Sequence, residues 1–218
     1  MFEELSEPVP VFPLPNVVLF PHAVLPLHVF ELRYRTMVRD ALSSRREIAM
    51  ALLKPGWERD YHGSPEFHAL GCLGRIEEVE WLPNDCYDLK LSGLTRVKFG
   101  RVVREFPYRA VRATRLPQHP VPEDDPLVAV EKQALREAHV RFARALGVPE
   151  SLPREWLSGM SLEGLTNLLC TLLDCEAESK LGLLAMDSVL ERAAAVREAM
   201  ERRMRERSRP DPAGGDHN

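Results

Sequence analysis

The pattern of hydrophobic and polar positions divides the chain into two parts. Residues 8–117 carry short apolar runs interrupted by prolines, whereas residues 123–207 carry longer stretches in which apolar side chains recur at helical spacing. The segment from Pro117 to Pro122 contains three prolines, which interrupt strand ladders and disfavour a helix. We therefore predict a β-rich domain at 8–117 and a helical domain at 123–207.

The β-rich part is predicted to contain several short strands around one helix. Residues 31–42 place Tyr34, Met37, Val38 and Ala41 on one helical face. The strands follow from alternating or continuous apolar positions, at 9–14, 23–30, 48–53, 87–92, 97–103 and 108–114. Short strands in this arrangement predict a small sheet curled into a barrel or a sandwich.

The second part is predicted to contain helices that form a bundle and pack against the sheet. The first helix covers residues 125–146, and the second begins after Ser161. A short helix over 175–184 follows. Asp187 is placed to cap the last helix, whose apolar residues recur at near-heptad spacing. Residues 208–218 contain no core residues, and we predict that they form a disordered tail.

Composition and charge are those of an ordinary globular protein. Hydrophobic residues make up 44% of the 218 residues and charged residues 28%, and the net charge is -4. This charge gives no overall preference for nucleic acid. No apolar run reaches the length of a membrane-spanning helix, and the start of the chain is acidic rather than basic as in a signal peptide. We therefore expect a cytoplasmic protein that does not contact a membrane.

The motifs of common catalytic sites are absent from the sequence. There is no GxxxxGK[ST] phosphate loop, no GxGxxG dinucleotide loop and no GxSxG nucleophile elbow. A serine–lysine hydrolase needs the two side chains to meet, but Ser179 and Lys180 are adjacent on a predicted helix and face different directions. We therefore expect no catalytic residues, no cofactor and no enzymatic activity.

The histidines and cysteines do not form a recognisable metal site. His68 and Cys72 have a plausible spacing for two ligands, and Cys86 lies on a nearby predicted strand, but a second close-spaced pair is missing. We expect these cysteines to be buried thiols rather than ligands or disulfides. His28 lies between apolar residues and is expected to be a buried or interface histidine rather than a catalyst.

Two charged clusters are expected to be solvated surfaces. Glu77, Glu78 and Glu80 precede Trp81 and would protect an edge strand from incorrect pairing. The arginines between Arg197 and Arg209 outnumber the acidic residues near them, but no aromatic residues interleave for base stacking. We interpret this second cluster as the soluble end of a helix.

Two stretches near the amino terminus carry prolines at characteristic spacing. Residues 10–21 (PVFPLPNVVLFP) and 25–38 (LPLHVFELRYRTMV) closely resemble the opening of the Lon protease substrate-binding domain. Residues 71–76 (GCLGRI) and 91–97 (LSGLTRV) resemble two later strands of that family. The family usually places Gly after the L-F-P turn. His22 stands there in this chain, although a left-handed backbone suits His less well than Gly.

The resemblance implies an α+β fold: a six-stranded pseudo-barrel of the PUA-like, Lon N-terminal type, followed by a C-terminal helical bundle. A full Lon protease continues into an ATPase module and a serine–lysine protease domain, which are absent from these 218 residues. The matching part of Lon is thought to recognise unfolded or tagged proteins. Most motif residues are expected to be structural, with a core made by Phe12, Leu14, Leu19, Leu27 and Phe30.

A protein partner is expected to bind near the aromatic loop at residues 55–67. Trp57 and Tyr61 are suitable interface anchors because each combines a large apolar area with a polar tip. Phe67 in the same loop and His28 complete the candidate protein-binding set. The alternative is that Trp57 fills the open end of the barrel.

Three functions are compatible with these observations. The favoured one is a non-catalytic module that binds unfolded or tagged protein segments, as an adaptor or holdase that works with a separate protease, and homo-oligomerisation is left open. The second is an RNA-binding domain on a PUA-like barrel, with a basic groove built from Arg96, Lys98, Arg101, Arg104, Arg109, Arg112 and Arg115. The third is a hydrolase with an unrecognised site.

Overall fold

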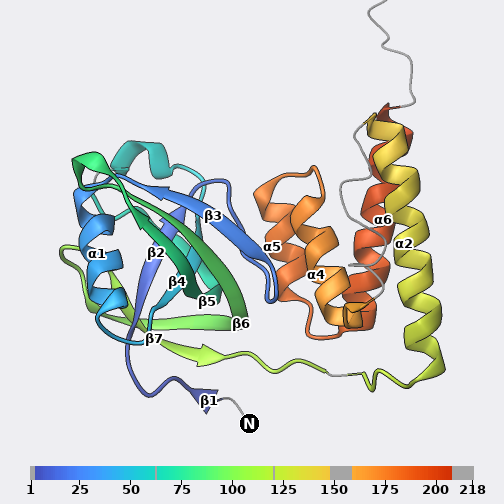
Figure 1. Ribbon diagram of the computed structural model, residues 1–218, viewed down its shortest axis with the longest axis horizontal. Helices are drawn as coiled ribbons and strands as arrows, with labels where there is room; N and C mark the ends of the chain where they lie inside the picture. Colours follow the sequence, from blue (N-terminus) through green and yellow to red (C-terminus); the bar gives the residue numbers. More distant parts are fainter. Residues whose placement is uncertain (1–2, 62, 120, 148–158, 208–218) are drawn as a thin grey trace, which may run out of the picture.

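Seven strands form one mixed sheet in the computed structural model, which describes residues 3–61, 63–119, 121–147 and 159–207. The strands are β1 (Glu3–Glu4), β2 (Val9–Leu14), β3 (Val24–Val29), β4 (Glu47–Leu53), β5 (Phe67–Trp81), β6 (Tyr87–Arg104) and β7 (Ala110–Arg115). Their order is β1-β7-β2-β4-β5-β6-β3, and only β2 and β4 run parallel. Strand β7 also pairs with β6, so the sheet curls back on itself (Figure 1).

The long strand β6 replaces two strands of the sequence prediction. We expected separate strands at 87–92 and 97–103, but pairing with β5 continues through the intervening residues. The register shifts where Gly74 pairs with Gly93 and Leu73 pairs with Thr95. A bulge of this kind inserts a residue and bends a strand without ending it, which a sequence pattern does not distinguish from a turn.

Alternation along the strands separates two buried clusters. Ala49 and Ala51 of β4 face the smaller cluster inside the curled sheet, together with Val11, Leu73 and other apolar residues. The residues of β4 that alternate with these alanines, Ile48, Met50 and Leu52, face the larger cluster. Because both faces of β4 are buried, its sequence is a continuous apolar run rather than an alternating one.

Among the described residues, five α-helices accompany the sheet: α1 (Leu32–Leu42), α2 (Pro126–Leu146), α4 (Leu162–Leu172), α5 (Ala177–Ala185) and α6 (Val189–Arg207). Asp125 caps α2 by accepting a hydrogen bond from the Leu127 amide at 2.8 Å, and Ser161 caps α4 in the same way. The predicted cap of α6 is wrong. Ser188 Oγ, rather than Asp187, accepts from the Glu191 amide, at 3.3 Å.

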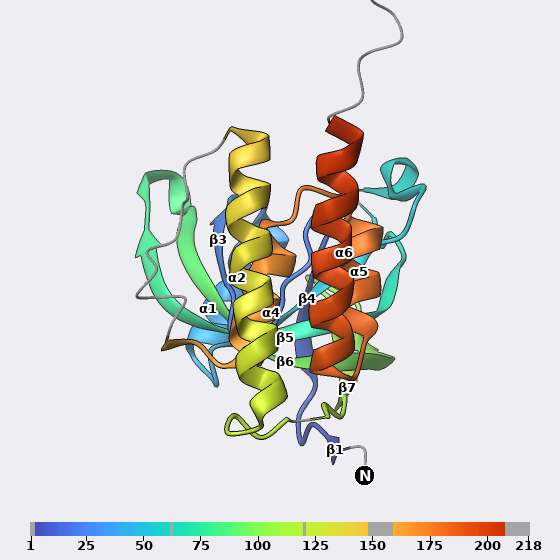
Figure 2. The ribbon, with the colours of Figure 1, turned by 90° about the vertical axis from the view of Figure 1, so that its right-hand side faces the viewer.

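Helices α2, α4, α5 and α6 lie together beside the sheet, with α2 and α6 side by side (Figures 1 and 2). The larger apolar cluster joins both parts of the molecule, because it contains Phe20 and Met37 as well as Leu165, Leu184 and Met200. The sequence pattern changes at the predicted boundary, residues 117–122, but the hydrophobic core continues from one side of it to the other. The predicted tail, residues 208–218, lies outside the described residues.

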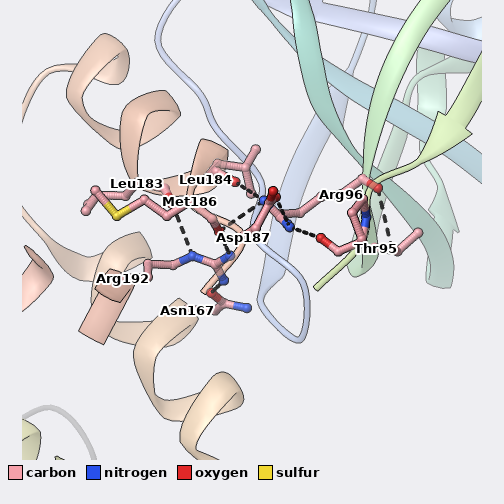
Figure 3. Close-up of polar contacts among 9 residues, drawn as sticks. Thr95, Arg96, Asn167, Leu183, Leu184, Met186, Asp187 and Arg192 are labelled. Carbon is pink, nitrogen blue, oxygen red and sulfur yellow. Dashed lines mark hydrogen bonds and ion pairs between the residues drawn. The ribbon is translucent and has the colours of Figure 1, made fainter. Parts of the chain in front are cut away.

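A buried arginine from β6 connects the sheet to the helices (Figure 3). Arg96 is only 1% exposed. Its guanidinium donates to the carbonyls of Leu184 and Met186, both at 3.0 Å, and also to the Pro117 carbonyl. Asp187 supplies a carboxylate oxygen at 2.8 Å. One side chain thus holds both the α5–α6 connection and the segment that leaves β7.

A second buried arginine approaches the same connection from the other side. Arg192 of α6 donates to the Leu183 carbonyl at 3.1 Å, to Asn167 Oδ1 at 2.7 Å and to the Met186 carbonyl. Asn167 in turn donates to the Pro21 carbonyl at 3.1 Å. Burial and the nearby Arg96 charge lower the pKa of Arg192. These bonds link α4, α6 and the turn that precedes β3.

The turn after Pro21 has a left-handed backbone, which glycine adopts more easily than other residues. His22 has φ +65°, and its Nε2 lies 3.6 Å from Glu163 Oε2 on α4. The nearby Glu163 carboxylate raises the pKa of His22 above its usual 6.5, against the effect of burial. The departure from glycine therefore adds a contact between the sheet and α4.

We expect this contact to make stability depend on pH. A folded pKa above the unfolded value contributes stability below pH 6.5 that is lost as pH rises through the folded pKa. As pH rises from about 6 to about 8, the free energy of unfolding should therefore fall less in His22→Gln than in the wild type. The difference should be below about 1 kcal/mol because the imidazole is half exposed. Urea unfolding at both pH values measures it, and equal losses in the two proteins would refute the expectation.

Candidate protein-binding surface

Helix α1 begins at a cluster of exposed apolar and aromatic side chains. Phe30 and Leu32 flank its N-cap residue Glu31 and are 61% and 70% exposed. Trp81, at the end of β5, is 71% exposed. These side chains and the half-buried rings of the loop that follows β4 are arranged around the start of α1, and we call this set the α1 rim: Phe30, Leu32, Trp57, Tyr61 and Trp81.

The loop carrying Trp57 is fixed to the start of α1 by polar contacts. The Tyr61 hydroxyl donates to Glu31 Oε1 at 2.9 Å, and Arg33 donates to the carbonyls of Tyr61 and Gly63 at 2.9 Å and 3.0 Å. Arg33 also forms an ion pair with Glu31 at 3.1 Å. Burial and the hydrogen bond to Glu31 raise the pKa of the Tyr61 phenol. The aromatic loop therefore has a defined position.

Trp57 and Tyr61 support one another within this loop. Residues Trp57–Asp60 form the short 3-10 helix η1, which begins after Gly56 at φ +89°, a left-handed backbone that glycine adopts without strain. The two rings meet edge to face with centroids 5.4 Å apart. Trp57 packs against neither buried cluster. This arrangement leaves Trp57 on the surface rather than in the sheet interior.

The β5–β6 connection reaches α1 from the other side. The 3-10 helix η2 (Pro83–Asp85) presents the Asn84 and Asp85 carbonyls to Arg35 at 3.1 Å and 3.2 Å. Trp81 Nε1 donates to Asp85 Oδ1 at 3.2 Å. Figure 1 shows α1 on the side of the sheet away from α2 and α6. Polar contacts thus place the aromatic groups around one helix terminus.

The four predicted binding residues are distributed unevenly about this surface. Trp57 and Tyr61 belong to the α1 rim, and His28 stacks on Phe30 with ring centroids 6.0 Å apart. His28 is not buried, since its side chain is 57% exposed and bonds to Asp88 Oδ1 at 2.6 Å. Phe67 faces inward. It meets the Phe99 ring at 5.5 Å and packs against the smaller cluster, so we leave it out of the rim.

Three members of the α1 rim were missed by the sequence interpretation. Phe30 was predicted as core, and this is wrong, whereas Phe12 and Leu19 are buried as predicted and Leu14 and Leu27 are partly buried. The alternation of side chains along β3 would have given the correct side for Phe30. Leu25, Leu27 and Val29 of β3 face inward, which assigns Phe30 to the outer face.

The basic groove of the RNA-binding alternative is not assembled. Arg96 is buried, and Arg109 lies over the Phe67 ring at 4.5 Å. Three of the remaining candidates have acidic neighbours within 4 Å, in the pairs Arg104–Asp40, Arg112–Glu4 and Arg115–Glu3. Along α6, Arg197 pairs with Glu131 at 3.0 Å and Arg203 with Asp174 at 2.8 Å, while Arg209 lies outside the described residues. These pairs offset the positive charge locally.

The residues considered for other chemistry have separate contacts. His68 Nε2 bonds to Glu178 Oε1 at 2.8 Å, and Lys180 donates to the Thr171 carbonyl at 2.8 Å rather than to Ser179. Burial raises the pKa of the Cys72 thiol to about 12, and all four cysteines are free. Within the described ranges, no three His, Cys, Asp or Glu side chains are grouped to hold a metal, and no helix is long and apolar enough to cross a membrane.

Comparisons with known proteins agree with the resemblance of the opening motifs. Residues 8–202 match the model of the "ATP-dependent protease La (LON) substrate-binding domain" family. A Lon protease of Anaeromyxobacter dehalogenans is 27% identical over 92% of this chain, and Lon protease 2 of Sorangium cellulosum is 30% identical over 69%. The chain spans only 24% and 18% of the lengths of these two relatives.

Solved structures show the same fold. A Lon N-terminal domain protein from Xanthomonas campestris superposes with a TM-score of 0.61 at 23% identity, covering 86% of this chain and 95% of that protein. The N-terminal domain of a Lon protease from the Mycobacterium avium complex gives 0.66 at 16% identity, covering 89% and 98%. The chain belongs to the Lon substrate-binding domain family.

Proposed function

We propose that the protein binds exposed apolar segments of unfolded or tagged proteins at the α1 rim and acts through binding alone. The supporting observation is the set of large apolar side chains that stay exposed there although their backbone and polar neighbours are fixed. An exposed apolar patch on an otherwise polar surface is typical of an interaction site. Aromatic side chains that combine apolar area with a polar group are the usual anchors of such sites.

In this proposal the curled sheet serves as a pseudo-barrel scaffold, and the bundle of α2, α4, α5 and α6 supports it from one side. Helix α1, whose start the rim surrounds, lies on the side of the sheet away from α2 and α6 (Figure 1), so a client would reach it without displacing those helices. The protein would act in the cytoplasm as an adaptor or holdase and pass bound clients to a separate protease. The Lon family of the comparisons motivates that partner.

Substitutions at the start of α1 test the α1 rim. Leu32→Ser and Phe30→Ser should each weaken binding of a fluorescently labelled unfolded client, such as reduced and carboxymethylated lactalbumin, about tenfold, because burial of such a side chain is worth roughly 1.5–3 kcal/mol. Fluorescence anisotropy titration measures the affinity. Circular dichroism and urea unfolding should show little change, since both side chains are exposed.

A matched control exists on α2. Leu127 is 62% exposed in the first turn of that helix, much as Leu32 is at the start of α1. Leu127→Ser should change the client affinity less than about twofold, as expected for a surface residue outside the interface. If Leu127→Ser weakens binding as much as Leu32→Ser, or if the wild-type protein binds no client, the proposal is wrong.

A further inference from the structure

A hollow of about 510 Å³ lies beside the α1 rim, on strands β3, β6 and β5. Its lining is formed by neighbouring positions of the three strands: Pro26, Leu27, His28, Glu78, Val79, Glu80, Asp88, Leu89 and Lys90. The register pairs Leu27 with Leu89 and Leu89 with Val79, and His28 with Asp88 and Asp88 with Glu80. Side chains paired in this way share one face of a sheet. We call this hollow the β3 groove.

Two rows of side chains stand on the outer face of the β3 groove. One row contains Pro26, Lys90 and Glu78, and in it Lys90 Nζ pairs with Glu78 Oε2 at 2.7 Å. The other row consists of His28, Asp88 and Glu80. The row between them, centred on the buried Leu89, points to the opposite face. The two outer rows therefore bound a trough across the strands.

The second row carries negative charge without a matching cation. Asp88 and Glu80 occupy directly opposed positions on antiparallel strands, and like charges placed in this way destabilise a sheet. Among the described residues, the ion-pair neighbour of Asp88 is His28, whose Nδ1 lies 2.6 Å from Asp88 Oδ1. Glu80 has no ion-pair partner in the part of the chain that the structure describes. A cationic group placed between these two carboxylates would relieve their repulsion.

Apolar surface continues from this charged row into the α1 rim. Phe30 stacks on His28 with ring centroids 6.0 Å apart and is itself part of the rim. A ligand that fills the trough and the rim together must therefore combine a positive charge with neighbouring apolar groups. A small inorganic cation would leave Phe30 uncovered.

We propose, building on the function proposed above, that the clients are extended segments in which a lysine or arginine lies next to apolar residues. The basic side chain binds between Asp88 and Glu80 in the β3 groove, and the adjacent apolar side chains cover Phe30 and the rest of the α1 rim. This rests on complementary charge and on the continuity of the two surfaces. Segments that carry a carboxylate at the same place are repelled.

Three labelled peptides of equal length and equal apolar content test the proposal, with Lys, Gln or Glu at one central position. The full chain should bind the Lys peptide about fivefold more tightly than the Gln peptide, as the strongest exposed ion pairs allow, and the Glu peptide least tightly. Added salt should reduce the differences between the peptides but not the affinity for the Gln peptide. Fluorescence anisotropy measures all three affinities.

Variants of β5 localise the effect. Glu80→Gln should lower the affinity for the Lys peptide toward that for the Gln peptide, because only Asp88 then remains, and it should leave the affinity for the Gln peptide unchanged. Glu77→Gln is the matched control, because it removes the same charge from the same strand at a residue that does not line the β3 groove. It should retain the preference for lysine.

The outcomes separate the two proposals. Equal affinities for the Lys and Gln peptides would overturn the lysine preference and leave the α1 rim as a binding site for apolar segments. Equal effects of Glu80→Gln and Glu77→Gln would also overturn it, because they would indicate the general surface charge rather than the β3 groove. Failure of all three peptides to bind would refute both proposals.

Discussion

Arg96→Ala should lower the free energy of unfolding by about 3 kcal/mol, because it removes a buried charge-assisted hydrogen-bond donor from several acceptors at once. The carbonyls of Leu184, Met186 and Pro117 would each lose this donor. Met186 keeps its bond from Arg192, and Asp187 is 47% exposed and can regain water. The lost stability therefore comes mainly from the carbonyls of Leu184 and Pro117, which are left without this donor, and from the lost packing of the aliphatic part of Arg96.

Urea unfolding monitored by circular dichroism measures this loss. Arg101→Ala is the control on the same strand, since Arg101 is exposed, and it should change stability by less than about 0.5 kcal/mol. Arg96→Lys retains the charge but not the planar fork that reaches acceptors on two segments, so it should recover only part of the loss. A cost below about 1 kcal/mol for Arg96→Ala would show that the junction depends on apolar packing rather than on this side chain.

Local pattern predicted the elements of the fold but not the contacts between distant segments. The strands β2, β4 and β7 and the helices α1, α2, α4, α5 and α6 follow from periodicity, capping residues and prolines, which act within a few positions of the chain. Arg96 was assigned to a possible basic groove because it lies on a strand rich in arginine. Its burial depends on carbonyls near residue 185, which become its acceptors only after α5 and α6 have packed beside the sheet.

The candidate surface was also predictable only in part, because local sequence pattern indicates some of its residues and contacts between distant segments place the others. Trp57 and Tyr61 are aromatic residues in a loop rich in turn-forming residues, and such composition indicates an interface without any tertiary information. Phe67 belongs to the same loop by sequence, but it begins β5 and its ring is drawn inward by Phe99. Trp81 joins the α1 rim only because Arg35 holds the β5–β6 connection against α1.

The second large expected effect on stability concerns Gly93, which packs against the turn at Phe20 and Pro21. Gly93 lies in β6 with its backbone bonded to this turn: the His22 amide donates to the Gly93 carbonyl and the Gly93 amide donates to the Ala23 carbonyl, both at 2.8 Å. A Cβ atom on Gly93 would lie 2.0 Å from the Phe20 carbonyl oxygen. A backbone atom cannot move aside as a flexible side chain can. The absence of a side chain here is required by space rather than by an unusual φ.

Gly93→Ala should therefore cost about 3 kcal/mol, the upper part of the usual range for overpacking, because it must separate two hydrogen-bonded backbone segments. Gly182→Ala is the control. It lies in α5 with nothing within 4 Å of the added Cβ, and it should stabilise the protein by about 0.5–1 kcal/mol through helix propensity. Urea unfolding of both variants measures these changes of opposite sign.

A second measurement shows whether the damage is at the turn. The same turn positions His22 against Glu163, so Gly93→Ala should also reduce the loss of stability between about pH 6 and about pH 8 that we expect from that pair. If Gly93→Ala is destabilised but its stability depends on pH as in the wild type, the strain lies elsewhere in β6. A variant as stable as the wild type would mean that the two segments separate at little cost, and then the Asn167 bond to Pro21 cannot be a rigid link between sheet and helices.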